Sequence, residues 1–195
     1  MIAATNPGHF PVAGLPEIAF LGRSNVGKSS VINSLVGKKL ARTSNTPGRT
    51  QSINFFEVRW PGNPRPELLL ADLPGYGYAR VPQQVSARWA DFIDPYVKER
   101  AALALYVALI DPNVPRQASD EQLLEFLTST GRPFVVVATK CDRLPGSRRQ
   151  AVLEELERDV PNARIIAFSA KTGLGRDELW REIRASVESH RAVAS

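Results

Sequence analysis

Several features are scarce in this chain of 195 residues, and each scarcity excludes a class of protein. A single cysteine, Cys141, excludes an internal disulfide and favours a reducing compartment. No run approaches the roughly 18 apolar residues that a membrane span needs, because the longest candidate, 101–110, suits a buried strand. The first residues lack a basic start followed by an apolar run, so we expect no secretory signal, no membrane partner and a cytoplasmic protein.

The remaining composition is that of one globular domain. Apolar residues make up 43% of the chain and charged residues 23%, which supplies a core and excludes wholesale disorder. The length suits one domain and is short for two. We therefore expect residues 1–195 to form a single domain, with residues 1–16 as an N-terminal extension that packs on it or leads into it.

The positive charge is mild overall but concentrated in one segment. The net charge of +5 permits a nucleic-acid or ribosomal partner without requiring one. Residues 37–50 carry Lys38, Lys39, Arg42 and Arg49 and no acidic residue. This segment is either a solvated basic loop or a loop beside the phosphates of a nucleotide or an RNA, and charge alone does not decide between them.

Short apolar runs alternate along the chain with longer amphipathic segments. Strands are predicted over residues 17–22, 53–60, 67–72, 103–111, 133–139 and 164–168, and helices over 89–97, 123–127, 152–156 and 179–187. The connector 61–66 is turn-forming and too short for a helix, so its flanking strands should form an antiparallel hairpin. Trp89 and Trp180 are expected to pack rather than to stack on bases. The alternation predicts an α/β fold, with a mostly parallel six-stranded sheet, one antiparallel edge strand and helices on both faces.

A phosphate-binding motif follows the first predicted strand. The run Gly22-Arg-Ser-Asn-Val-Gly-Lys-Ser matches G-x-x-x-x-G-K-[ST] and leads into a helical run over residues 30–35. Its glycines let backbone N–H groups turn toward phosphate oxygens, and the N-terminal end of the helix attracts the same anion. Lys28 is expected to bridge the β- and γ-phosphates, and Ser29 to offer its hydroxyl to Mg²⁺. The alternative is an ordinary glycine-rich turn, which the placement between strand and helix disfavours.

A second motif, Asp72-Leu-Pro-Gly75, follows the apolar run 68–71. An aspartate at the end of a buried strand beside a phosphate loop can hold Mg²⁺ through a water molecule, and the N–H of Gly75 can meet the γ-phosphate. Such a turn is common in isolation. Its position about 45 residues after the loop lysine is what gives it weight.

Two further motifs predict recognition of guanine. Thr139-Lys-Cys-Asp142 follows a predicted strand, and the Asp142 carboxylate can accept hydrogen bonds from guanine N1–H and the N2 amino group, which adenine does not offer. The stem of Lys140 can lie along the base. Phe168-Ser-Ala170 follows the last strand, and the N–H of Ala170 can donate to guanine O6. Alone, Asp142 would be read as a helix cap, so the order of the motifs carries the assignment.

Together these motifs resemble the translation-factor-like branch of P-loop GTPases. The runs Thr-Pro-Gly-Arg-Thr-Gln over 46–51 and Asp-Leu-Pro-Gly-Tyr-Gly-Tyr-Ala over 72–79, with the loop 22–30, are similar to the EngB family of bacterial GTPases. The resemblance extends over roughly residues 10–190. It implies a Ras-like P-loop GTPase that acts in the bacterial cytoplasm in assembly of the large ribosomal subunit. A monomer is the default expectation for a switch of this size. The family is also linked to cell division and septation.

The resemblance also implies a site residue by residue. The expected catalytic residues are Lys28, Thr50 and Gly75, and the expected Mg²⁺ ligands are Ser29, Thr50 and Asp72. The expected contacts to GTP or GDP are Gly22, Arg23, Ser24, Asn25, Val26, Gly27, Lys28, Ser29, Ser30, Gly48, Arg49, Thr50, Gln51, Ser52, Asp72, Leu73, Pro74, Gly75, Thr139, Lys140, Cys141, Asp142, Phe168, Ser169 and Ala170.

Three departures from the commoner patterns affect these expectations. Tyr76 stands where Ras-like enzymes have the glutamine that orients the attacking water, so slow intrinsic turnover is expected. Related GTPases that lack this glutamine use K⁺ held partly by a loop asparagine, and Asn25 occupies that position. Thr139 replaces the usual asparagine and has half an amide's hydrogen-bonding repertoire, yet guanine preference should survive. Asn113 stands where the family has arginine, which puts that arginine's contacts in doubt.

Three hypotheses stay open at this point. The leading one is a GTP-hydrolysing switch, with Tyr76, Tyr78 and Arg80 either contacting RNA or packing the switch against the sheet. The second is a guanine-nucleotide-dependent RNA-binding module whose hydrolysis is incidental. The third, a P-loop ATPase or small-molecule kinase, requires Asp142 to be a mere cap, and competition between GDP and ADP separates it from the other two.

Overall fold

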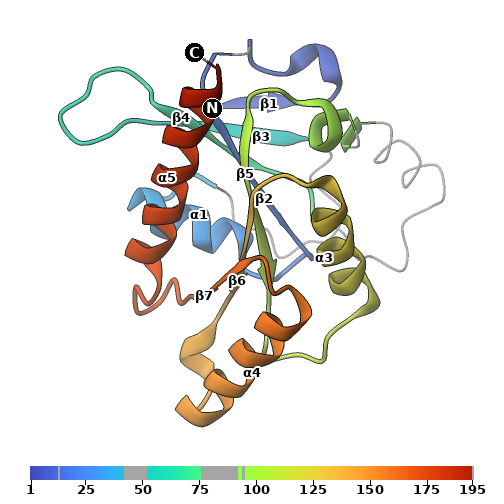
Figure 1. Cartoon of the computed structure of the whole chain (residues 1–195). Coiled ribbons are helices and arrows are strands. Elements are labelled where there is room, and N and C mark those ends of the chain that lie inside the picture. Colours follow the sequence, from blue (N-terminus) through green and yellow to red (C-terminus); the bar gives the residue numbers. More distant parts are fainter. Residues whose placement is uncertain (13, 42–51, 76–91, 94, 195) are drawn as a thin grey trace.

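The computed structural model describes residues 1–12, 14–41, 52–75, 92–93 and 95–194. Over these residues seven strands form one sheet in the order β1-β3-β4-β2-β5-β6-β7 (Figure 1). The strands are β1 Ile2–Ala4, β2 Glu17–Gly22, β3 Ile53–Val58, β4 Leu68–Asp72, β5 Leu103–Ile110, β6 Phe134–Ala138 and β7 Arg164–Ala167. The predicted strands are therefore confirmed to within two residues at each end.

The sheet is parallel from β4 through β2, β5 and β6 to β7, whereas β3 runs antiparallel to β4. This confirms the mostly parallel α/β sheet and its hairpin. The expected six strands are corrected to seven, because β1 pairs with β3, Ile2 opposite Phe55 and Ala4 opposite Ile53, and takes the edge position. A strand of three residues carries too little pattern to be recognised in a sequence.

Helices cover both faces of the sheet (Figure 1). They are α1 Lys28–Val36, α3 Ala118–Thr130, α4 Gly146–Asp159 and α5 Arg176–Ala194, with short 3-10 turns at η1 Pro7–His9 and η2 Cys141–Arg143. Residues 92–93 and 95–99 are also helical. These helices fall where amphipathic segments were predicted, whereas Trp89 lies outside the described residues. No helix in the described part of the chain is long and apolar enough to span a membrane.

Alternate side chains of β2 enter two separate cores, as the pleat of a strand requires. On β2, Ile18 and Phe20 face the core that contains α1 and α5, while Ala19 and Leu21 face the core that contains α3 and α4. Because β2 is buried on both faces, it is held in place along its whole length. Its last residue, Gly22, is therefore a fixed starting point for the loop that follows it.

Part of the N-terminal segment 1–12 contacts the rest of the described structure. Besides β1, this segment supplies Phe10, whose ring stacks on Phe92 with centroids 5.6 Å apart and meets Tyr96 edge-on at 5.3 Å. The Arg100 guanidinium lies 5.6 Å from the Phe10 ring and donates a hydrogen bond of 2.6 Å to the carbonyl of Pro11. Arg100 also forms an ion pair with Glu17, a buried residue at the start of β2.

Replacing Phe10 with alanine should test this packing. We expect Phe10→Ala to lower the free energy of unfolding by about 2 kcal/mol, because a partly buried ring loses its aromatic neighbours. Urea unfolding followed by circular dichroism measures the change. Val12→Ala is the matched control, since Val12 is 95% exposed and its loss should cost under about 0.5 kcal/mol. Equal effects of the two substitutions would contradict the packing role.

Candidate nucleotide-binding site

The loop between β2 and α1 leaves the sheet in close contact with its neighbours and adopts left-handed backbone conformations before the helix begins. A Cβ placed on Gly22 would lie 2.9 Å from Val26 Cγ1 and 3.0 Å from the Leu109 carbonyl oxygen, so only glycine lets the loop leave the sheet so closely. Gly27 has φ of 107°, a left-handed conformation that disfavours other residues. Asn25 also has positive φ, 64°, which asparagine tolerates better than most residues.

The first turn of α1 is open to an anion. Gly27 is its N-cap and provides no side-chain hydrogen bond, so the capping position satisfies none of the N–H groups at the start of the helix. Those groups and the helix dipole favour negative charge at this end. The loop and α1 together form the strand–loop–helix arrangement that the sequence motif predicts.

The second motif lies against the first. Lys28, at the start of α1, forms an ion pair with Asp72, the last residue of β4. A Cβ on Gly75 would lie 2.6 Å from Ser24 Oγ and 3.0 Å from Ser24 N, which places the Gly75 backbone directly on the phosphate loop. The geometry thus joins two motifs that are about 45 residues apart in the sequence.

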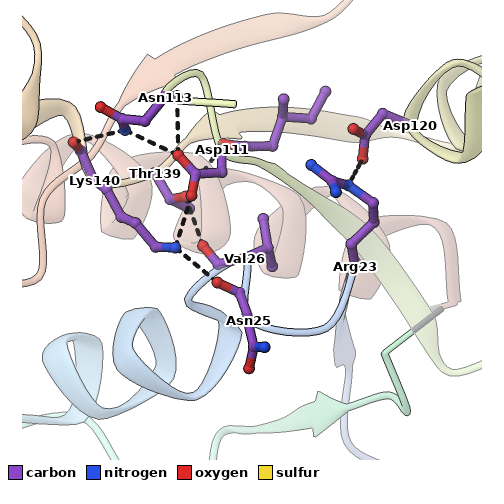
Figure 2. A network of polar contacts seen from close by, with 9 residues as sticks. Arg23, Asn25, Val26, Asp111, Asn113, Asp120, Thr139 and Lys140 are labelled. Carbon is purple, nitrogen blue, oxygen red and sulfur yellow. Dashed lines mark hydrogen bonds and ion pairs between the residues drawn. The ribbon is translucent and has the colours of Figure 1, made fainter. Parts of the chain in front are cut away.

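The third motif holds the loop from the other side (Figure 2). The Thr139 hydroxyl, buried at the end of β6, donates to the Val26 carbonyl at 2.7 Å and lies 3.2 Å from the Ile110 carbonyl. Lys140 Nζ donates to the Asn25 carbonyl at 2.7 Å. Threonine therefore satisfies a loop carbonyl here, although it has fewer hydrogen-bonding groups than the asparagine usual at this position.

The Lys140 ammonium also forms an ion pair of 2.7 Å with Asp111, which directly follows β5. The Asn113 side chain donates to the Asp111 carboxylate at 2.9 Å and to the Lys140 carbonyl at 3.2 Å. Burial works to raise the pKa of the Asp111 carboxyl, but the hydrogen bonds from Lys140 and Asn113 outweigh it and lower that pKa below its ordinary value. Asp111 is thus a charged anchor for Lys140, and Asn113 supplies contacts of its own at the position where the family has arginine.

The base motifs meet through a side-chain hydrogen bond. Ser169 is fully buried, and its hydroxyl donates to the Asp142 carboxylate at 2.7 Å. That hydrogen bond lowers the pKa of the exposed Asp142 carboxyl, so the group is ionised at neutral pH and points an acceptor at solvent.

Cys141 is buried, and burial raises the pKa of its thiol, which fits a small packing residue rather than a reactive one.

A cavity of about 790 Å³ runs between the phosphate loop and the base motifs, within the size range of ligand pockets. Its lining residues come from the loop and α1, from the segment after β6 and from the segment after β7. They include Gly27, Ser30, Thr139, Lys140, Asp142, Phe168 and Ala170. The structure therefore brings three of the predicted motifs to one cavity, while Asp72 and Gly75 lie at the other side of the loop.

Several expected contacts cannot be placed. Gly48, Arg49, Thr50 and Gln51 lie outside the described residues, as do Tyr76, Tyr78 and Arg80. Ser52 is the first described residue after that gap and lies 3.4 Å from Asn54 Oδ1 through its hydroxyl. The roles expected of these residues stay predictions.

The residues present fit a magnesium ion held mainly by a nucleotide. Ser29 and Asp72 supply a hydroxyl and a carboxylate, the hard oxygen ligands that Mg²⁺ prefers. Among the described residues there is no group of three or more His, Cys, Asp or Glu that would cage a metal. Mg²⁺ in phosphate sites takes one or two protein ligands and keeps waters and phosphate oxygens, so two protein oxygens suffice here.

The strand–loop–helix arrangement, the sheet order and the cavity define a P-loop GTPase, and the comparisons with known proteins agree. A family model described as "50S ribosome-binding GTPase" matches residues 17–140. The probable GTP-binding protein EngB of Koribacter versatilis is 56% identical over 183 residues, which covers 94% of this chain and 90% of that protein. The corresponding protein of Acidobacterium capsulatum is 52% identical over 195 residues, which covers 99% and 92%. The chain belongs to the EngB family of GTP-binding proteins, which are GTPases.

Solved structures confirm the fold. A crystal structure of a probable GTP-binding protein EngB superposes with a TM-score of 0.70 at 26% identity, covering 89% of this chain and 99% of that one. Era in complex with MgGDPNP and nucleotides 1506–1542 of 16S ribosomal RNA superposes with a TM-score of 0.72 at 23% identity, covering 88% and 56%. The Era likeness is one of fold.

Asp142→Asn should test guanine selection. The substitution replaces an acceptor for guanine N1–H and N2 with an amide that points one donor at them, so GDP affinity should fall at least about tenfold. Xanthosine diphosphate, which has a carbonyl at the same ring position, should gain affinity. Fluorescence titration measures both. Asp177→Asn, an exposed aspartate in the first turn of α5, is the control, and an unchanged GDP affinity in Asp142→Asn would contradict the assignment.

Proposed function

We propose that this GTPase is a molecular switch in assembly of the large ribosomal subunit, working as a monomer in the bacterial cytoplasm. The observation that carries the proposal is the match of residues 17–140 to the 50S ribosome-binding GTPase family, in a chain whose cavity joins a phosphate loop to a base-selecting carboxylate. The mild net charge of +5 suits an RNA-rich partner.

In this proposal the phosphate loop, residues 22–30, holds the phosphates through its N–H groups. Lys28 meets the β- and γ-phosphates, and Gly75 meets the γ-phosphate through its backbone. Ser29, Asp72 and Thr50 would hold Mg²⁺, which would neutralise phosphate charge. Asp142 and Ala170 select guanine.

The Lys28–Asp72 ion pair supports these roles. The two side chains are 12% and 9% exposed, so each charge is largely removed from water. If nucleotide and Mg²⁺ bind here, Lys28 would pair with a phosphate and Asp72 would help to hold the metal, so each side chain would keep a partner of opposite charge. The pair therefore keeps both charges satisfied in the protein without nucleotide, at the place where ligand charges would enter.

A second cavity supplies a surface suited to RNA. It has a volume of about 630 Å³ and lies between α1, β3 and α5. The Arg184 guanidinium stacks over Trp60 at 4.8 Å, and Trp60 meets Trp180 edge-on at 5.5 Å. Lys38, Arg59 and Arg176 also line this cavity, and among the described lining residues Glu57 alone is acidic. Guanidinium planes beside aromatic rings suit unpaired RNA bases, and the cations suit phosphates.

The two cavities meet at the end of α1. Lys38 lines both of them. Asn33 fixes the chain that follows, because its side-chain oxygen accepts hydrogen bonds of 2.8 Å from the N–H groups of Leu40 and Ala41. The segment that leads toward Thr50 therefore starts from a fixed point between the nucleotide cavity and the basic aromatic cavity. This arrangement supports coupling of nucleotide state to docking.

Sedimentation with large ribosomal subunits tests the proposal. We expect association with a non-hydrolysable GTP analogue, and weaker association with GDP or without nucleotide, at physiological salt because charge-driven RNA binding depends on salt. Arg59→Glu with Arg184→Glu should weaken that association. Arg148→Glu, an exposed cation on α4, is the control.

Equal association in all three nucleotide states would instead favour an RNA-binding module whose hydrolysis is incidental. The same conclusion would follow if Lys28→Ala, which lacks the phosphate-binding ammonium, still supported subunit assembly. No association in any state would overturn the ribosomal proposal and leave the GTPase assignment in place.

Potassium dependence is the second test. Asn25 is exposed, and its side-chain amide points away from Lys140 (Figure 2), so its oxygen is free to join a K⁺ ion beside the phosphates. We expect faster GTP hydrolysis in K⁺ than in Na⁺ at matched ionic strength, measured by phosphate release. Asn25→Gly keeps the positive φ without strain and removes the oxygen, so the two rates should become equal. Equal rates in the unmodified protein would contradict the K⁺ site.

A further inference from the structure

The side chain of Arg23 points away from the cavity that takes the nucleotide. Arg23 is the second residue of the phosphate loop, and its Nε donates to Asp120 Oδ1 at 2.9 Å (Figure 2). Asp120 is fully buried, and the Arg23 side chain is 17% exposed. The two residues are 97 positions apart in the sequence, so the pair joins the loop to a distant element.

Asp120 has a second role in the helix that carries it. It lies in the first turn of α3, where its Oδ2 accepts a hydrogen bond of 3.4 Å from the Gln117 N–H, and the Gln117 side chain completes a capping box. One oxygen of the carboxylate therefore caps α3 and the other binds Arg23. The position of the Arg23 side chain is tied to the start of α3.

With this pair, the phosphate loop is held from two directions. On one side, Lys140 and Thr139 bind the carbonyls of Asn25 and Val26. On the other side, Asp120 binds the side chain of Arg23. These contacts use two carbonyl groups and one side chain of the loop. The Val26 N–H is bonded to the Arg23 carbonyl within the loop, and the contacts from Thr139, Lys140 and Asp120 occupy none of the loop N–H groups that phosphate oxygens would need.

We propose that Arg23 and Asp120 are positioning residues of the GTPase site, and that their ion pair sets how tightly the phosphate loop holds GDP and GTP. Loss of either partner leaves a buried charge without its partner and frees one end of the loop. The N–H groups must then be ordered when the nucleotide binds, which lowers affinity and speeds release. This proposal concerns nucleotide binding alone and does not depend on the ribosomal partner.

A mutant cycle tests the proposal. Arg23→Met keeps the apolar stem, and Asp120→Asn keeps the size of the side chain and an acceptor for the α3 cap. Each should raise the GDP dissociation rate, measured by stopped flow with a fluorescent GDP, by about tenfold, and the double variant should release GDP no faster than either single variant. Arg23→Lys, which retains one cationic donor, should restore part of the slow release.

A second buried ion pair provides the matched control. Glu17 and Arg100 pair at the opposite end of β2, with side chains 1% and 14% exposed. The six residues of β2 place that pair roughly 17 Å from the loop. Arg100→Met should lower the melting temperature about as much as Arg23→Met, yet change GDP release by less than about twofold.

Each alternative outcome overturns the proposal. If Arg23→Met and Asp120→Asn lower the melting temperature while GDP release stays unchanged, the pair only stabilises the fold. If Arg23→Met speeds release and Asp120→Asn does not, Arg23 contacts the nucleotide directly. If the effects of the two substitutions add in the double variant, the residues act independently. The melting temperature of each variant, with and without GDP, shows whether it is folded.

Discussion

Two carbonyl groups of the phosphate loop, those of Asn25 and Val26, are bound by the segment that follows β6, and the rest of the site depends on this constraint. The Thr139 hydroxyl donates to the Val26 carbonyl, and the Lys140 ammonium donates to the Asn25 carbonyl. With these two carbonyls held from behind, other N–H groups of the loop can turn toward an anion in the cavity. The same two residues begin the motif that ends in Asp142, so one short segment after β6 positions both the phosphate loop and the carboxylate proposed to select the base. The spacing between the loop and Asp142 is thereby set by the backbone that follows β6.

Two ion pairs neutralise charged side chains of this site in the protein without ligand. Lys28 pairs with Asp72, and Lys140 pairs with Asp111. The first pair lies where the phosphates and Mg²⁺ are proposed to bind, so nucleotide binding would give each of its members a new partner. The second lies behind the loop, where the Lys140 ammonium also donates to the Asn25 carbonyl. We therefore expect the first pair to change with the nucleotide and the second to keep holding the loop.

Much of this structure follows from local sequence. The strands and helices were predictable because their apolar patterns match the faces they bury. The phosphate loop was predictable because its glycines stand where the backbone needs close approach or a positive φ. The edge strand β1 could not be predicted, because three residues are too few to show an alternating apolar pattern. Nor could the Arg23–Asp120 pair, because pairing across 97 positions is set by the fold and not by a local pattern. Asn113 shows the same limit. Because asparagine replaces the family's arginine at this position, the sequence put the arginine's contact in doubt. In the structure the Asn113 side chain binds the Asp111 carboxylate and the Lys140 carbonyl.

The contacts behind the phosphate loop, together with Asp142 and Ala170, should make the cavity selective for guanine nucleotides. Calorimetric titration of the unmodified protein with GDP and with ADP, at the same Mg²⁺ concentration, measures that selectivity. We expect saturable binding of one GDP per chain and ADP binding weaker by at least about a hundredfold, because a site built to hydrogen-bond one base leaves polar groups unpaired with the other. Equal affinities, or tighter ADP, would contradict it and return the chain to the ATPase or small-molecule kinase class.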